Sequence, residues 1–402
     1  MSGYRMATGW GNLTRSNGES INELPTGTTP TTAVQSLTKR FGGAMSLTLS
    51  RNNNNNYNHD IGFREFTIAS QGTYECDWNL DGLIAPQYVT WLANVFMSDG
   101  ISITSDSTFT NASGTVITSP TATTVGYSTT GGVTPQNTLT YAEFSHYQTI
   151  IGTTAMVVMM FKYKRNNGIK TFDMGFVQNN SMTTYGGNNV VGVLTGCAVN
   201  SFTISYENGS DDAVKITLEG HALTDYVEVV DNPYDYVQYL DAVPKSTLIA
   251  GCLSTSEDGS TYTKVAITDS SSLSVTNNLS RLGICLNRFY TAYAMGALDY
   301  SVSTSTYSND PNKYLSKLYG YDTLAIGSTY YPSKQPYAIP YARIRADDTD
   351  AETTTATAFV DILMENVYTG NMDNTYDAEN AVMDEPSLTP QHVTVVVGYT
   401  PA

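Results

Sequence analysis

Residues 60–100 change their hydrophobic period part-way along, and this change constrains the fold more than any other feature of the chain. Over Tyr74–Leu80 every second side chain is apolar, which is the pattern of a β-strand with one buried face. Over Tyr88–Phe96 the apolar side chains recur instead at i, i+3, i+4, i+7 and i+8, the stripe of an amphipathic helix. Pro86 suits the first turn of such a helix. The stretch therefore predicts a half-buried strand followed by one short amphipathic helix at about residues 86–97.

Most other patterned stretches alternate with period 2, which favours strands. Turn residues between paired apolar runs predict three hairpins, over 155–177 around Asn167-Gly168, over 202–218, and over 246–267. Further strands are expected at 44–50, 359–368 and 393–399, whereas 279–298 could be strand or helix. The predicted fold class is mainly β, a β-sandwich or barrel with few helices.

The distribution of turn residues suggests how the chain is divided. Residues 1–40 are rich in Gly, Thr and Pro with little periodicity, so we expect an extended N-terminal arm. Residues 41–402 are then one β domain with insertions at about 101–150 and 226–275 and a C-terminal β segment. The tract Asn52–Asn56 is expected at a solvated loop tip.

Charge is sparse and strongly acidic. Charged residues make up 14% of the chain, and 37 acidic against 20 basic residues give a net charge of −17. This balance argues against a protein that grips nucleic-acid phosphates, because such proteins present basic patches. Much of the polar composition is instead Thr, Ser, Asn and Tyr, neutral side chains that subunit contacts desolvate at lower cost than charges.

The cysteines and the apolar runs give further exclusions. The four cysteines, at 76, 197, 252 and 285, form no CxxC pair and are expected as buried, reduced thiols. The longest apolar run, Ala155–Phe161, is strand-sized rather than membrane-spanning. No signal-peptide core is visible at the start, so we expect folding in the cytoplasm.

No catalytic or ligand-binding motif emerges. The four histidines, His59, His146, His221 and His392, lack ligand-type spacing. The acidic run Asp347–Glu352 lacks the Gly and distal Glu of an EF-hand loop. Nucleotide fingerprints and a GxSxG elbow are missing, although a Ser–His–Asp triad assembled only by the fold stays open. We therefore expect no enzyme activity, no catalytic, cofactor-binding or metal-binding residues, and no cofactor.

Two elements resemble the tail tube proteins of long-tailed bacteriophages. The first comprises Ile61-Gly62-Phe63-Arg64, Gly72, the alternating strand Tyr74–Leu80 and the helix-forming stretch Leu83–Phe96. The second is the hairpin Cys197–Gly220, and the Val-rich C-terminal strand fits the same plan. The resemblance covers about half of the chain, with long segments between the matching parts.

The resemblance implies a tail-tube type of β-sandwich with extended arms and a structural role in the virion. It implies a subunit that forms hexameric rings stacked into a hollow tail tube, made in the host cytoplasm, through which DNA passes without sequence-specific binding. The implied partners are copies of itself and other tail proteins: a sheath if the tail contracts, a tape measure protein inside, and baseplate and terminator proteins at the ends. Membranes are not implied as partners. Two alternatives stay open: another β-rich virion component, such as a capsid decoration or spike protein, and a carbohydrate-binding or carbohydrate-active β-sandwich, which the 29 tyrosines would suit.

Overall fold

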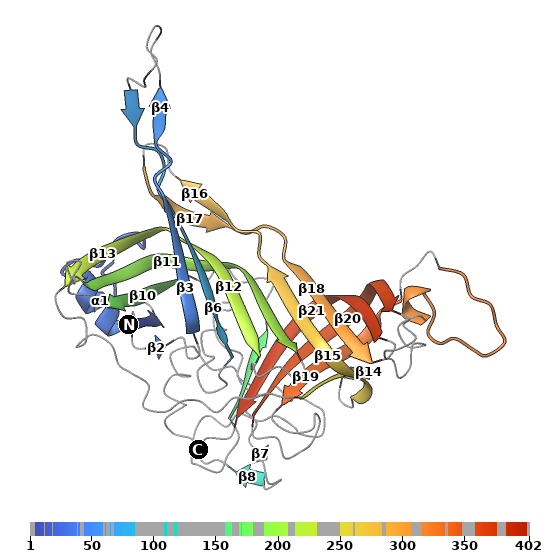
Figure 1. Ribbon diagram of the computed structural model, residues 1–402. Helices are drawn as coiled ribbons and strands as arrows, with labels where there is room; N and C mark the ends of the chain where they lie inside the picture. Colours follow the sequence, from blue (N-terminus) through green and yellow to red (C-terminus); the bar gives the residue numbers. More distant parts are fainter. Residues whose placement is uncertain are drawn as a thin grey trace, which may run out of the picture.

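The computed structural model shows a mainly β protein with few helical residues (Figure 1). It describes residues 5–11, 13–17, 19–37, 39–40, 44–58, 61, 65, 68–84, 108–110, 116–118, 157–162, 169, 171–179, 189–207, 214–230, 250–259, 262–283, 287–307, 316–333, 337–347, 358–375 and 383–399. The helix expected at 86–97 and most of the insertion expected at 101–150 lie outside these ranges, so both stay predictions.

The elements follow the chain in this order. They are β1 (Arg5–Gly11), α1 (Pro30–Ser36), β2 (Lys39–Arg40), β3 (Ala44–Asn52), β4 (Asn56–Asn58), β5 (Ile68–Ser70), β6 (Glu75–Leu83), β7 (Thr108–Thr110), β8 (Val116–Thr118), β9 (Val157–Lys162), β10 (Phe172–Asn179), β11 (Asn189–Glu207), β12 (Lys215–Ala222), β13 (Thr224–Val230), β14 (Ala250–Ser256), β15 (Thr263–Thr276), β16 (Ser280–Gly283), β17 (Tyr290–Ala294), β18 (Asp299–Tyr307), β19 (Ile339–Asp347), β20 (Ala358–Thr375) and β21 (Met383–Tyr399).

Fifteen of these strands form one antiparallel sheet that closes on itself in one region. There the pairing runs β14–β19–β20–β21–β18–β15 and returns to β14. Closure is possible because long strands change neighbours along their length: β21 pairs with β18 near its amino end and with β9 near its carboxyl end, beside β20 throughout. Outside this circuit the sheet continues from β15 through β11, β12 and β6 to β3. The expected mainly β, antiparallel character is confirmed.

Strand β11 joins two parts of the sheet. Its first half pairs with β10 and β13, and its second half pairs with β12 and β15. The backbone changes direction at Gly196, whose φ is +62°. A Cβ at this position would lie 2.8 Å from the Leu223 side chain, so glycine meets both the conformational and the steric requirement.

The strand predicted over Tyr74–Leu80 is β6, and its apolar side chains are buried as expected. Trp78 is the largest fully buried side chain among the described residues; its indole N–H donates to the His221 carbonyl at 3.1 Å, and its ring meets Phe172 edge-on. Space for the ring exists because residue 220 is glycine: a Cβ there would lie 2.2 Å from the indole. A residue without a side chain on β12 thus admits the largest side chain of β6 into the core.

The expectation of buried, reduced cysteines is confirmed for two of the four. Cys76 and Cys197 are free and fully buried in the main core. Burial raises the pKa of Cys76 to about 12 and the pKa of Cys197 well above its usual value. The side chains of Cys252 and Cys285 lie outside the described part of the chain.

The described N-terminal residues fold onto the sheet, which differs from the extended arm expected for residues 1–40. Strand β1 pairs with β10 along its whole length, and α1 packs on β10, β11 and β13. Ala33 and Leu37 are buried there beside Leu13 and Val193. These apolar residues are too irregularly spaced to produce a periodic signal, yet the fold collects them into a small second core.

The pairing corrects the hairpin expected over 155–177. Both strands predicted within 155–177 form, as β9 and β10, but β9 pairs with β21 and β10 pairs with β1 and β11. They are therefore not a hairpin, because pairing partners distant in the sequence take both strands. Residues 226–275, expected as an insertion, contribute β14, β15 and most of β13 to the main sheet. The hairpins expected at 202–218 and 246–267 are confirmed as β11–β12 and β14–β15, and 279–298 contains the β16–β17 hairpin.

Candidate interaction surface

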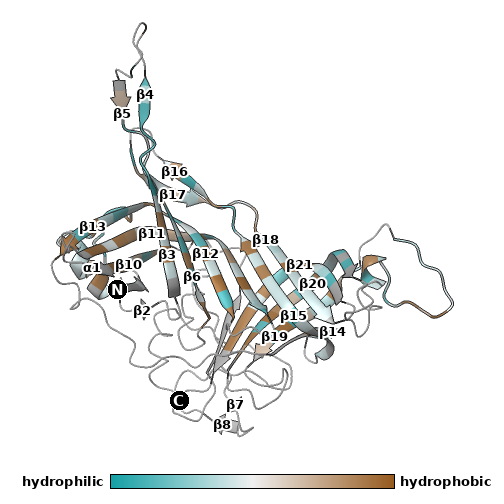
Figure 2. Cartoon of the chain, viewed as in Figure 1, coloured by the Kyte–Doolittle hydropathy of each residue, from teal (hydrophilic) through white to brown (hydrophobic). Residues whose placement is uncertain are grey.

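The neighbouring strands β3, β6, β12, β11, β15 and β18 present a surface made mainly of small hydroxyl side chains. Each strand alternates, so one set of side chains enters the core and the other forms the opposite face; Figure 2 shows the alternation as brown and pale residues along these strands. The register places Thr203 between Thr217 and Ser274, and Ser274 beside Ser301. We call this surface the hydroxyl face; it comprises Ser46, Thr48, Ser50, Asp77, Asn79, Asp81, Ser201, Thr203, Ser205, Lys215, Thr217, Glu219, His221, Ser272, Ser274, Thr276, Asp299, Ser301 and Ser303.

Hydroxyl groups on this face donate to its carboxylates. Asp81 accepts from Ser46 at 3.1 Å and from Thr217 at 2.9 Å, and Glu219 accepts from Ser201 at 3.0 Å. The residues that define this face include four carboxylates, Asp77, Asp81, Glu219 and Asp299, and, as bases, only Lys215 and His221. The hydroxyl face is therefore polar and net acidic in the part of the chain that is described.

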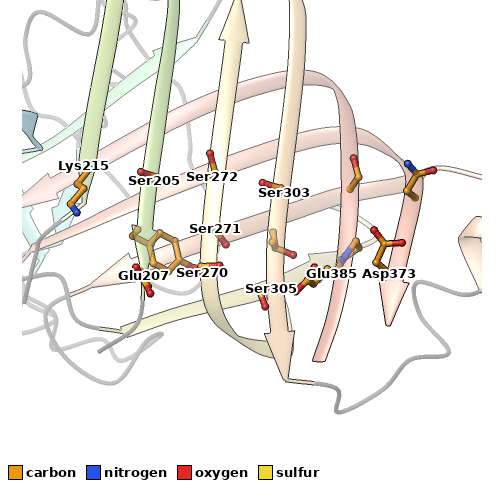
Figure 3. Close-up of a pocket in the computed structure, with 15 residues that line it drawn as sticks. Ser205, Glu207, Lys215, Ser270, Ser271, Ser272, Ser303, Ser305, Asp373 and Glu385 are labelled. Carbon is orange, nitrogen blue, oxygen red and sulfur yellow. The ribbon is translucent and has the colours of Figure 1, made fainter. Parts of the chain in front are cut away.

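A groove of about 560 Å³ lies where the hydroxyl face meets the ends of β20 and β21 (Figure 3). Serines of β11, β15, β18 and β21 line it, together with Tyr206, Lys215 and three carboxylates, Glu207, Asp373 and Glu385. Asp373 and Glu385 are directly opposite each other on β20 and β21, a like-charge pair that is disfavoured unless it is well solvated. The groove thus extends the acidic, hydroxyl-lined character of the face.

The opposite end of the face holds a charged cluster. His221 Nδ1 lies 2.6 Å from Asp77 Oδ1, and Arg281, reaching over from β16, also donates to Asp77. Ser50 lies on β3, on the other side of Asp77 from His221. A nucleophilic triad needs the histidine between the serine and the carboxylate, so Ser50, Asp77 and His221 do not have the order that such catalysis requires.

A two-stranded arm projects from the same end of the sheet. Strands β3 and β6 lead into the β4–β5 hairpin, which extends away from the body of the molecule at the top of Figure 1. Tyr57 is 55% exposed and Ile61 is fully exposed on this arm. Exposed apolar side chains at the end of a projecting hairpin make the arm suited to contact another molecule.

Arg288 fixes the base of the arm. Its guanidinium donates to Gln71 Oε1 at 3.1 Å and to the Asn53 side chain, so it joins the two segments that enter and leave the arm. It also lies over the Tyr74 ring at 5.7 Å. The Tyr74 hydroxyl donates to Asp225, and burial together with this hydrogen bond raises the pKa of Tyr74.

The other histidines and the acidic run are only partly described. His392 is on β21 opposite Glu365, far in the sheet from His221, while His59, His146 and residues 348–352 lie outside the described ranges. No group of three or more metal-ligating side chains occurs among the described residues, and no helix described here is long and apolar enough to span a membrane. The hydroxyl face was not predicted from the sequence, although SSSLSVT and YSVSTST at 270–276 and 300–306 show it as alternating Ser/Thr and apolar residues.

No protein-family model matches the chain, and no curated protein sequence matches it.

Proposed function

We propose that this chain is the structural subunit of a phage tail tube, in which copies form rings that stack into a hollow tube. The main support for the proposal is the hydroxyl face, a continuous polar surface across neighbouring strands. The β4–β5 arm projects from one end of this face and is held at its base by Arg288. The sequence resemblance to tail tube proteins points the same way. The tail-tube type of sandwich is part of this proposal.

In this arrangement the hydroxyl face lines the channel. A wall that binds DNA through many basic side chains would hold it, because each contact releases counterions from the polyanion. Hydroxyl groups and solvated carboxylates such as Asp81 and Glu219 give a wall along which DNA can move. The projecting arm, with Tyr57 and Ile61 exposed, then contacts a neighbouring copy.

Electron microscopy of the purified full-length chain tests the proposal. We expect open-ended tubes or stacked rings with a central channel. A variant in which residues 55–69 are replaced by a short Gly-Ser turn should remain folded by circular dichroism yet form no tubes, because β3 and β6 stay paired without the arm. Purely monomeric protein at millimolar concentration would contradict the proposal.

The groove at the end of the hydroxyl face supports a second candidate, carbohydrate binding. Its volume of about 560 Å³ and its serine, carboxylate and Tyr206 lining could accommodate a small saccharide. Titration calorimetry with a panel of bacterial cell-wall saccharides distinguishes the candidates: saturable binding that Glu385→Gln abolishes, by a chain that forms no tubes, would favour this alternative.

A further inference from the structure

We propose that Ile326 and Tyr331 on one flank of the chain pack against Val227 and Val229 on the opposite flank of a second copy. This contact would join subunits side by side within a ring. The inference rests on the proposed function, since it identifies one of the contacts that such an assembly needs.

The first surface is the tip of residues 316–333, which we call the tyrosine loop. The Tyr321 hydroxyl donates to the Tyr331 carbonyl at 3.1 Å, and the Ala325 N–H donates to the Tyr330 hydroxyl at 2.9 Å. The rings of Tyr321 and Tyr330 meet edge-on with centroids 4.9 Å apart. The loop is therefore held by its own side chains, as compact functional loops often are.

This internal packing leaves two large side chains on the outside. Ile326, next to Gly327 at the turn, is fully exposed, and Tyr331 is 74% exposed. The charges of the loop cancel locally, since the Lys317 ammonium lies 2.7 Å from Asp322 and 4.0 Å from the Tyr337 ring centroid. An ordered, neutral and partly aromatic tip loses little entropy and little hydration on contact with a protein surface.

The second surface is on β13, which pairs only with β11 among the described strands. Val227 and Val229 point to the same side and are 56% and 59% exposed. The intervening Glu228 points to the other side, where it accepts a hydrogen bond from Thr31 of α1 at 2.5 Å. A pair of exposed β-branched side chains on an edge strand is a typical protein-docking feature.

Charge and position indicate that the partner is a copy of this chain. With a net charge of −17, most surfaces of two copies repel each other, and neutral apolar patches are where they can approach at least cost. Strand β13 lies at the left of Figure 1 and the tyrosine loop at the right, so the two patches cannot meet within one chain. Patches on opposite flanks form a head-to-tail contact, the kind that closes into rings.

The size of the patches also favours a ring over a pair. Two valines, an isoleucine and a tyrosine bury a few hundred Å² at most, below the roughly 800 Å² per partner of a stable pairwise interface. In a closed ring each subunit makes the contact twice, and the second contact benefits from the effective concentration that the first provides.

Two variants of the full-length chain test the contact, Ile326→Asp and Val229→Asp. Each should raise the concentration needed for assembly, measured by sedimentation and electron microscopy, by more than about tenfold, because an unpaired carboxylate would be desolvated in the contact. Leu282→Asp, at an exposed apolar site on β16 outside both patches, adds the same charge elsewhere and should assemble like the wild type.

Mixing the two variants provides a sharper test. Each retains the patch that the other lacks, so light scattering should detect a weak, concentration-dependent one-to-one association in the mixture that neither variant shows alone. Wild-type assembly together with normal assembly of both variants would overturn the contact but leave the proposed function standing. If the wild type forms rings that do not stack, and neither variant forms rings, the contact is supported but the stacked tube is contradicted. A wild-type chain that remains monomeric would overturn both.

Discussion

Asp173 shows how one buried carboxylate organises the N-terminal residues. Its two oxygens accept the N–H groups of Leu13 and Gly196, each at 3.0 Å, and Arg15 lies 3.4 Å away. Burial raises the pKa of Asp173 in spite of these contacts, because desolvation penalises the charged form most strongly. The same carboxylate therefore attaches the segment after β1 to the point where β11 changes direction.

The raised pKa of Asp173 predicts the direction in which the effect of Asp173→Asn on stability changes with pH. The folded state holds this proton more tightly than the unfolded chain, whose aspartates titrate at about pH 4. The contribution of Asp173 to stability is therefore fully present below that pH and falls as pH rises through the folded-state pKa. Urea denaturation across a pH series measures the difference in unfolding free energy between wild type and Asp173→Asn. This difference should decrease as the pH rises through this window.

Asp322→Asn is a matched control with the opposite sign. The hydrogen bond from Lys317 lowers the pKa of this exposed carboxylate. Its small contribution to folding stability is therefore present above the unfolded-state pKa and is lost as pH falls through the folded-state pKa. If the stability of Asp173→Asn instead followed the wild type at a constant offset from pH 3 to pH 7, the assignment of a raised pKa to Asp173 would be wrong.

At the scale of elements, the β4–β5 arm depends on contacts at its base. Isolated two-stranded hairpins are only marginally stable in water. Arg288 joins both segments of this one and stacks on Tyr74, whose backbone N–H in turn donates to the Arg288 carbonyl at 2.9 Å. The direction of the arm is therefore set by a contact with the chain just before β17, not by the hairpin itself.

Arg288→Ala should release the arm while leaving the sheet intact. We expect a loss in unfolding free energy of about 1 kcal/mol, typical of a side chain outside the core, together with faster amide hydrogen exchange in β4 and β5. Tube formation should weaken because the arm is no longer directed toward a neighbour. Lys215→Ala removes an exposed positive charge far from the arm and should change neither hydrogen exchange in the arm nor tube formation. If hydrogen exchange in β4 and β5 is unchanged in Arg288→Ala, the arm is held by other contacts.

At the scale of the whole molecule, the acidic charge opposes assembly. Each copy carries −17, and carboxylates brought close together in a ring repel one another unless salt screens them. The concentration needed for assembly should therefore be lower in 150 mM salt than in 10 mM salt, between which the Debye length falls from about 30 Å to about 8 Å. Sedimentation of the full-length chain measures this. Tighter assembly at low salt would mean that ion pairs between copies, rather than neutral contacts, hold the subunits together.

The sequence by itself determined the local character of most described strands. Alternation alone identified the buried face of β6, including Trp78, and the Asn, Gly and Asp residues of the turns located the β11–β12 and β14–β15 hairpins. These features depend on side-chain period and on turn conformations, which neighbouring residues decide. The same alternation in 270–276 and 300–306 carries the hydroxyl face, so that surface was readable from the residues.

Only the tertiary structure decided which strands pair and which side chains meet. Strands β9 and β10 are close in sequence, yet β9 joins β21 and β10 joins β1, because hydrogen bonding to a strand edge carries little sequence information. Residues 5–37 read as an arm because their few apolar side chains have no period, and it is Val193 and Asp173, more than a hundred residues away, that hold them. Contacts across such separations are set by the closure of the whole sheet, which no local pattern specifies.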